Sequence, residues 1–220
     1  MAVTDQNLCN ELQFHLLETP NNGASYGSGL YTAAEVAGRL NFRADLFNKL
    51  TDVYLSTATA NATSGTKSQD LSSAVSTFID LVDVFYSSDN GTTYTQIPEG
   101  SSIEGDKYIT DQTAVALPSF YTLDTASVLT LIFFPAPTFT GSNGKIKFLY
   151  SARLGTLPAT PNGSSFSIPD DFTPFIKYGA LADLFMKSGE TYDPARANIA
   201  EALFQLGVEA TKGWLTGEST

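Results

Sequence analysis

Two pairs of neighbouring carboxylates are the groups in this sequence that could do general acid–base chemistry. They are Asp80 with Asp83 and Asp170 with Asp171. Glycoside hydrolysis uses two carboxyl groups roughly 5–9 Å apart on either side of a sugar. Asp170 and Asp171, however, stand at the start of an expected helix, where the helix dipole stabilises anions. We therefore interpret them as helix-capping residues and expect no catalytic residue in the chain.

A single cysteine and a single histidine limit the remaining chemistry. Cys9 has no partner for an intrachain disulfide, and His15 has no second histidine for a metal hydrolase or a catalytic triad. A structural zinc site needs about four ligands. The sequence also lacks a phosphate-binding glycine loop, a nucleophile elbow and a His-Glu-x-x-His pattern. It thus predicts no enzyme, no bound metal and no cofactor.

The run Asp89, Asn90 and Gly91 resembles a fragment of a calcium-binding loop. The alternating oxygen ligands and the closing glutamate of an EF-hand are missing around it. An Asn-Gly step between two strand-like runs is instead typical of a hairpin turn, and we favour that interpretation.

Composition and net charge limit the kinds of molecule that this chain can bind. The 220 residues carry a net charge of −11, and 42% of them are hydrophobic, which is enough for a folded core. A strongly acidic chain binds the phosphate backbone of duplex DNA poorly, although it could line a channel through which DNA slides. No apolar run approaches the ~20 residues of a membrane span, and the first residues lack the basic start of a signal peptide. We expect a soluble protein with no membrane partner.

Two helices are expected near the N-terminus. Leucines recur every four residues over residues 5–17, which predicts a short helix. Thr32 as N-cap and Glu35 three residues later form a capping box, and an amphipathic pattern follows over residues 33–56. Residues 56–70 are small and polar, which favours a mobile linker or a long loop.

The middle of the chain changes to strand periodicity. Between about residues 71 and 155 we count five to seven short strands at a spacing suited to an antiparallel sandwich or barrel. A Pro-Ala-Pro run at residues 135–137 is expected to stop one of these strands.

Two helices are expected to close the chain. Asp170 or Asp171 caps the first, and Pro174 lies in its first turn. Asp193 as N-cap with Pro194 at the first helical position starts the second. Small residues, Gly179 among them, allow the two helices to pack closely.

The last helix has an apolar face whose members recur at helical spacing: Ile199, Leu203, Leu206, Ala210 and Trp214. Trp214 is the single tryptophan. Either it belongs to the core of the last helix, or it is an interface anchor, a role in which tryptophan is enriched.

The fold class that follows is α+β: an N-terminal helix, an antiparallel β-sandwich or barrel-like module, and a C-terminal helix pair. Along the chain we divide it into an N-terminal extension (1–29), a helix and linker (30–70), a β-module (71–165), and the helix pair with its tail (166–220). We treat these as parts of one structural domain.

Five motifs in this order resemble a known family. They are Leu-Tyr-Thr-Ala-Ala-Glu-Val at 30–36, the strand and Pro-Ala-Pro run at 129–137, Ile-Pro-Asp-Asp-Phe-Thr-Pro at 168–174, Tyr-Gly-Ala-Leu at 178–181 and Asp-Pro-Ala-Arg-Ala at 193–197. Together they resemble the head-to-tail adaptor (connector, or neck) proteins of tailed bacteriophages. The β-region here is longer than in that family, and residues 1–29 have no counterpart in it.

The resemblance implies a structural virion protein at the head–tail junction, made in the cytoplasm of the bacterial host. In the family, a ring of typically twelve copies lies between the portal protein and tail or neck proteins, and viral DNA passes through without sequence-specific binding. Residues 194–220 would dock on the portal. The side chains that this docking would use are Arg196, Leu203, Leu206, Trp214 and Leu215.

Two other function classes remain open from the residues. Ten tyrosines and an acidic balance would also suit a β-sandwich accessory virion protein that binds a receptor or a glycan. A glycosidase using the paired carboxylates is the third interpretation, and it predicts loss of hydrolysis in Asp→Asn variants.

Overall fold

The structure is a computed structural model that describes residues 3–17, 21–27, 29–100, 115–124, 129–139, 144–189 and 192–217. The chain forms two compact units. The helical unit combines Met1–Tyr54 with Ala152–Thr220, and the β unit is Leu55–Ser151. The units cut across the four segments drawn from the sequence, and as a statement about domains that division stays a prediction. The α+β class is confirmed.

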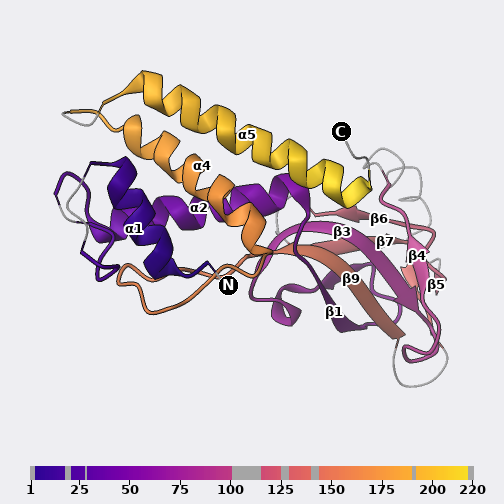
Figure 1. The fold of residues 1–220 in the computed structure, drawn as a ribbon. Coiled ribbons are helices and arrows are strands. Elements are labelled where there is room, and N and C mark those ends of the chain that lie inside the picture. The colour runs from indigo at the N-terminus through magenta and orange to yellow at the C-terminus, as the bar shows by residue number, and fades with distance from the viewer. Residues whose placement is uncertain are drawn as a thin grey trace. The chain divides into compact units, whose positions relative to one another are not determined.

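The helical unit is built around the C-terminal helix pair. Its helices are α1 (Asp5–His15), α2 (Ala33–Thr51), α4 (Thr173–Phe185) and α5 (Pro194–Thr216), with a 3₁₀ turn η2 at Asp170–Phe172. In Figure 1, α4 and α5 run antiparallel beside each other, in orange and yellow. Helices α1 and α2 both contact α4. The largest fully buried side chains of this unit include Leu8, Leu12, Tyr26, Leu40, Phe47, Leu154 and Phe204.

Helix α2 starts where the sequence predicts and ends earlier. Thr32 Oγ1 accepts a hydrogen bond from the backbone N–H of Glu35 at 3.3 Å, as an N-cap does. The Glu35 carboxylate lies 2.9 Å from Lys187 Nζ, an ion pair that the capping box did not predict. The predicted end at residue 56 is wrong. Asp52 takes a left-handed conformation (φ 52°), which ends the helix and leads the chain into a strand.

The entry to α4 corrects the predicted role of Asp170. Neither η2 nor α4 has a side-chain N-cap, so Asp170 and Asp171 do not cap the helix. Asp170 Oδ1 instead accepts a hydrogen bond from the backbone N–H of Val3 at 3.0 Å, which ties the N-terminal segment to this turn. Pro174 lies in the first turn of α4, where its missing N–H costs nothing.

Glycines let the two C-terminal helices approach closely. A Cβ on Gly179 of α4 would lie 2.7 Å from Phe204 Cδ2, and a Cβ on Gly207 of α5 would lie 2.1 Å from Phe175 Cγ. Both distances are far inside van der Waals contact, so only glycine fits at this spacing. The close packing expected of Gly179 is present.

The β unit contains three sheets among its described residues. Strands β1 (Leu55–Ala62), β9 (Gly144–Ala152), β3 (Phe78–Ser87) and β4 (Thr95–Ile97) form one antiparallel sheet in that order. Strands β2 (Ser68–Asp70), β7 (Thr130–Phe134) and β6 (Phe120–Leu123) form the second. Strands β5 (Val115–Ala116) and β8 (Ala136–Pro137) pair in parallel, and η1 is a 3₁₀ turn at Ser72–Ala74.

One expectation for this unit is wrong. Residues 56–70 are not a linker, because β1 pairs with β9 along its whole length and β2 pairs with β7. Alternate residues of β1 are more and less exposed, but its inward side chains are only serine and alanine, so a hydrophobicity pattern does not detect it. The Pro-Ala-Pro run stops a strand as predicted, because β7 ends at Phe134; Ala136 and Pro137 then form β8, which pairs in a different sheet. The apolar run that predicts a strand begins at residues 127–128, which lie outside the described residues.

Gly38 and Gly207 provide a matched test of the close helix packing in the helical unit. Gly38 is inside α2, and a Cβ added to it would have no other atom within 4 Å. We expect Gly38→Ala to raise the free energy of unfolding by about 0.5–1 kcal/mol, because alanine restricts the unfolded chain and favours the helix. Gly207→Ala should lower it, because Phe175 must move. Urea unfolding followed by circular dichroism measures both, and equal effects of the two variants would contradict this description.

Candidate docking surface

Helix α5 has one apolar face in the core and a second one exposed. Asp193 Oδ1 accepts a hydrogen bond from the backbone N–H of Arg196 at 3.0 Å, and Pro194 occupies the first turn. The buried residues of α5 are Ala197, Ala200, Phe204, Gly207, Val208 and Thr211. This is not the face that hydrophobicity predicts, because the residues turned toward α4 are mostly small.

The apolar face that the sequence predicts for this helix is therefore largely exposed. Ile199 is 63% exposed, Leu206 60% and Trp214 63%. With Leu203 and Ala210 they form a stripe along one side of the helix at spacings of three and four residues. We call these five residues the exposed stripe. Scattered exposed apolar residues are ordinary, whereas an aligned row of them marks an interaction surface.

At the N-terminal end of α5 the exposed stripe runs into a groove. The groove has a volume of about 430 Å³ and lies between the end of α1, the middle of α4 and the start of α5. Its apolar walls include Phe14, Leu17, Tyr178, Ile199 and Leu203, and Arg196 stands at its edge. Phe14 is 72% exposed, so part of this wall faces solvent.

His15 belongs to the aromatic wall of the groove. Its ring meets that of Tyr178 edge-on at 6.0 Å between centroids and that of Phe14 at 5.8 Å. Partial burial, and then the nearby charge of Lys177, lower the pKa of His15 below its usual value, so the imidazole is neutral at pH 7. Lys177 Nζ is held by Glu11 Oε2 at 2.6 Å. His15 therefore presents an uncharged ring to the groove.

The C-terminal end of α5 carries Trp214 and Leu215, which we call the apolar end. The Trp214 ring meets Phe172 edge-on at 5.5 Å, so one edge is packed while most of the side chain is exposed. The interpretation of Trp214 as a core residue is wrong. The five side chains assigned to portal docking are thus divided between two places. Arg196 and Leu203 lie at the groove, Trp214 and Leu215 at the apolar end, and Leu206 between them.

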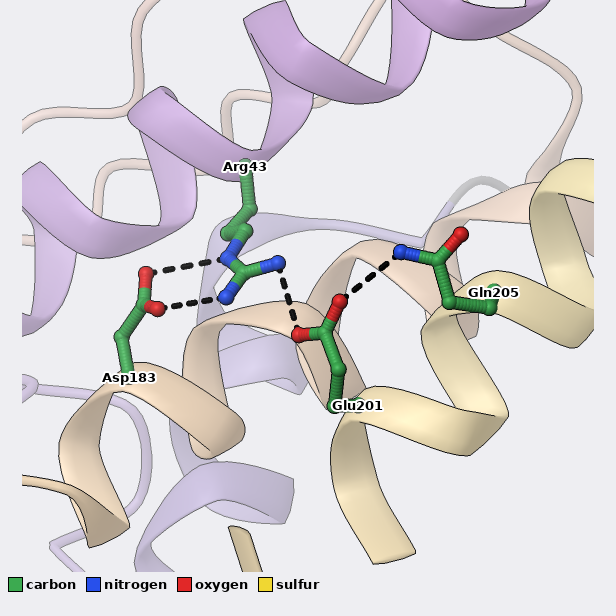
Figure 2. Close-up of polar contacts among 4 residues, drawn as sticks. All are labelled: Arg43, Asp183, Glu201 and Gln205. Carbon is green, nitrogen blue, oxygen red and sulfur yellow. Dashed lines mark hydrogen bonds and ion pairs between the residues drawn. The ribbon is translucent and has the colours of Figure 1, made fainter. Parts of the chain in front are cut away.

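An ion cluster joins helices α2, α4 and α5 (Figure 2). The Arg43 guanidinium of α2 donates from Nε to Asp183 Oδ2 of α4 at 3.0 Å and from Nη2 to Oδ1 at 2.5 Å. Its Nη1 lies 2.9 Å from Glu201 Oε2 of α5, and Gln205 Nε2 donates to Glu201 Oε1 at 2.8 Å. Arg43 stands three residues after Leu40 and four before Phe47, so its spacing puts it on the apolar side of α2, which is a signal that its side chain is largely buried.

The carboxylates considered for catalysis do not form a paired site. Asp80 and Asp83 are three residues apart on β3, so their side chains leave opposite faces of the sheet. Gln96 Nε2 donates to Asp83 Oδ1 at 2.7 Å. Asp170 holds Val3 N, and Asp171 is exposed beside it.

Asp89 is a turn residue. Its Oδ1 accepts hydrogen bonds from Ser87 Oγ at 2.6 Å and from the backbone N–H groups of Thr92 and Thr93 at 3.1 and 2.9 Å. These bonds, that of the Ser87 hydroxyl foremost, lower the pKa of Asp89 to about 2. Within the described ranges, no three His, Cys, Asp or Glu side chains cluster closely enough to hold a metal ion.

Comparison with known protein families decides the identity of the chain. The model of a family described as SU10 adaptor protein matches residues 7–217. The chain belongs to the SU10 adaptor protein family. The match extends over both units and all of α5. Because it starts at residue 7, the expectation that residues 1–29 have no counterpart is wrong for residues 7–29. No curated protein matches the chain.

Membership confirms the coarse part of the resemblance. The chain is a phage adaptor protein and hence a virion component, and an adaptor of this kind interacts with portal and tail proteins. The helices described here include none that is both long enough and apolar enough to cross a membrane. The docking residues assigned by resemblance stay predictions, as do the ring and its position.

Proposed function

We propose that this protein is a structural head-to-tail adaptor: copies of it form a ring, twelve by resemblance, between the portal and the tail. The observation that carries the proposal is the exposed stripe of α5 within a chain whose family match spans residues 7–217. A row of large apolar side chains on a 23-residue helix is costly to leave in water, so assembly is the natural use for it.

The charge of the chain supports a channel through which DNA passes. A net charge of −11 per copy repels the phosphate backbone within a Debye length of about 8–10 Å. A DNA conduit should not hold its cargo, because binding would slow ejection. The acidic balance therefore favours passage of DNA over sequence-specific binding.

A structural rather than catalytic role is part of the proposal. Asp80 and Asp83 lie on opposite faces of a strand, so they cannot act together on one substrate. Asp170 is hydrogen-bonded to Val3 at the turn before α4. His15 is part of an apolar wall. The carboxylate pairs thus offer no support for a glycosidase.

We propose that Leu206 contacts the portal. It lies in the middle of the exposed stripe, away from both the groove and the apolar end. We expect Leu206→Asp to abolish association with the portal while the fold persists, because an aspartate cannot enter an apolar interface without losing its hydration. Asn198→Asp, which adds the same charge to an exposed site of α5 outside the stripe, is the matched control and should bind normally.

Negative-stain imaging with the portal protein of the same genome tests the proposal. The expected result is an added ring of density on one face of the portal with wild-type protein and with Asn198→Asp, and bare portals with Leu206→Asp. Bare portals with wild-type protein would refute the adaptor function. In that case a glycan screen would test the accessory binding protein that the tyrosine content leaves open.

A further inference from the structure

The two ends of α5 present apolar surfaces of complementary form. At one end is the groove, with Phe14 and Ile199 on its walls. At the other end Trp214 and Leu215 project into solvent. The groove is an open hollow with apolar walls. Trp214 is a large apolar side chain that is mostly exposed to solvent.

These two surfaces cannot meet within one copy. Ile199 and Trp214 lie 15 residues apart on a single continuous helix, which separates them by about 22 Å at 1.5 Å per residue. Because α5 is one continuous helix, its two ends cannot come together. The groove can therefore receive an apolar end only from another molecule.

Each end carries charges of both signs, and Arg196 at one end is complementary to Asp171 at the other. At the groove, Arg196 Nε faces Asp193 Oδ2 at 3.4 Å, and about half of the Arg196 side chain is exposed. A guanidinium has five N–H donors and can take a second carboxylate. At the apolar end, the exposed Asp171 stands next to Phe172, which holds Trp214. In a chain of net charge −11, contact between copies is favoured where a cation of one meets an anion of the other.

We infer that the groove of one copy receives Trp214 and Leu215 of the next copy. The contact joins two different patches, so it is heterologous and repeats around a closed ring or along a filament. A tryptophan that fills a desolvated pocket is a typical interface anchor. This inference rests on the proposed ring and names the surfaces that build it. It assigns Trp214 and Leu215 to the neighbouring copy and leaves Leu206 to the portal.

Mixing two defective variants tests the contact. Ile199→Asp spoils the groove and keeps the apolar end, whereas Trp214→Ala does the reverse; circular dichroism verifies that both are folded. By sedimentation velocity, each variant alone should lose self-association by at least about thirty-fold in Kd relative to wild type. Their mixture retains one intact contact and should give a heterodimer and nothing larger. A mixture that behaves as two monomers, while wild type associates, overturns the inference.

Cross-linking extends the test to weak association and to the assembled ring. Phe14→Cys and Leu215→Cys are prepared separately and treated with a short bismaleimide, alone and mixed, with and without the portal. Cys9 is buried, and wild type provides its background. A cross-linked dimer that forms only in the mixture supports the inference, and its absence in both conditions refutes it.

The experiments with the portal protein distinguish a failure of this inference from a failure of the proposed function. If Trp214→Ala loses portal binding while the wild-type pattern of self-association persists, the apolar end belongs to the portal and the inference fails. If the mixed cross-link forms but no variant or wild-type protein binds the portal, the copies meet as inferred and the adaptor function fails.

Discussion

Replacing Phe204 by alanine is expected to lower the free energy of unfolding of the helical unit by about 3–5 kcal/mol. The ring is fully buried and lies 6.0 Å from the Phe47 ring, with the Arg43 guanidinium over its face at 5.1 Å. Gly179 presents only backbone to it, so no neighbouring side chain from that position can fill the cavity. Trp214 is the only tryptophan and packs on Phe172, so its fluorescence during urea unfolding reports on α5.

Leu206→Ala is the control for this prediction. It truncates a large apolar side chain on the same helix, but at an exposed position, and should change the free energy of unfolding by no more than about 0.5 kcal/mol. The sequence alone does not predict this order, because the regular apolar face of the helix contains Leu206 and not Phe204. A larger loss in Leu206→Ala than in Phe204→Ala would show that α5 is rotated from the orientation described here.

The difference between the predicted and observed faces of α5 has a physical origin. Its pattern of large apolar residues is regular, and periodicity identifies that face correctly as a distinct apolar surface. Periodicity cannot tell whether water or protein covers the surface. The buried face of α5 contains Ala197, Ala200 and Gly207 because α4 approaches it closely, and small residues carry little hydrophobic signal.

Helix starts were predictable and helix ends less so. Thr32 and Asp193 cap their helices as the sequence predicts, because an N-cap is a local hydrogen bond between neighbours in the chain. Asp170 is likewise an aspartate that precedes a helix. Its side chain nevertheless accepts a hydrogen bond from the backbone N–H of Val3, which is 167 residues away in the chain. A long-range partner of this kind is invisible to local rules.

Some of the strands were likewise predictable from the sequence, and others were not. Those rich in aromatic and branched residues, such as β3 and β9, were predictable from alternation. Strand β1 was not, because its pairing with β9 supplies the order that its small side chains do not encode. The groove was also beyond prediction, since its walls come from three helices far apart in the chain.

These observations connect the assembly surface to the ion cluster beneath it. The buried side of α5 packs on α4 and α2, which leaves the exposed stripe facing outward. The close glycine contacts and the charged hydrogen bonds of the cluster both have a set geometry, and we expect the cluster to favour one rotation of α5. Glu201, which Arg43 binds, is therefore a residue that sets which side chains of α5 are offered to a partner (Figure 2).

Replacing Arg43 by alanine is accordingly expected to lower the free energy of unfolding by about 2–3 kcal/mol. Breaking a fully buried pair costs about 3–5 kcal/mol, and we reduce that figure because water reaches Glu201 in part. Loss of Arg43 leaves the half-buried Asp183 carboxylate without its two charged hydrogen bonds. Urea unfolding followed by Trp214 fluorescence measures the loss.

Arg153→Ala is the matched control, because its pair with Asp45 is 3.7 Å long and more exposed, and it should cost less than about 1 kcal/mol. The double variant Arg43→Met with Asp183→Leu should recover part of the loss, since it removes both charges together and keeps apolar volume. Portal binding of that double variant then separates stability from orientation. If the cluster orients α5, binding should remain weakened after stability is restored. Full binding at restored stability would show that helix packing alone sets the exposed stripe.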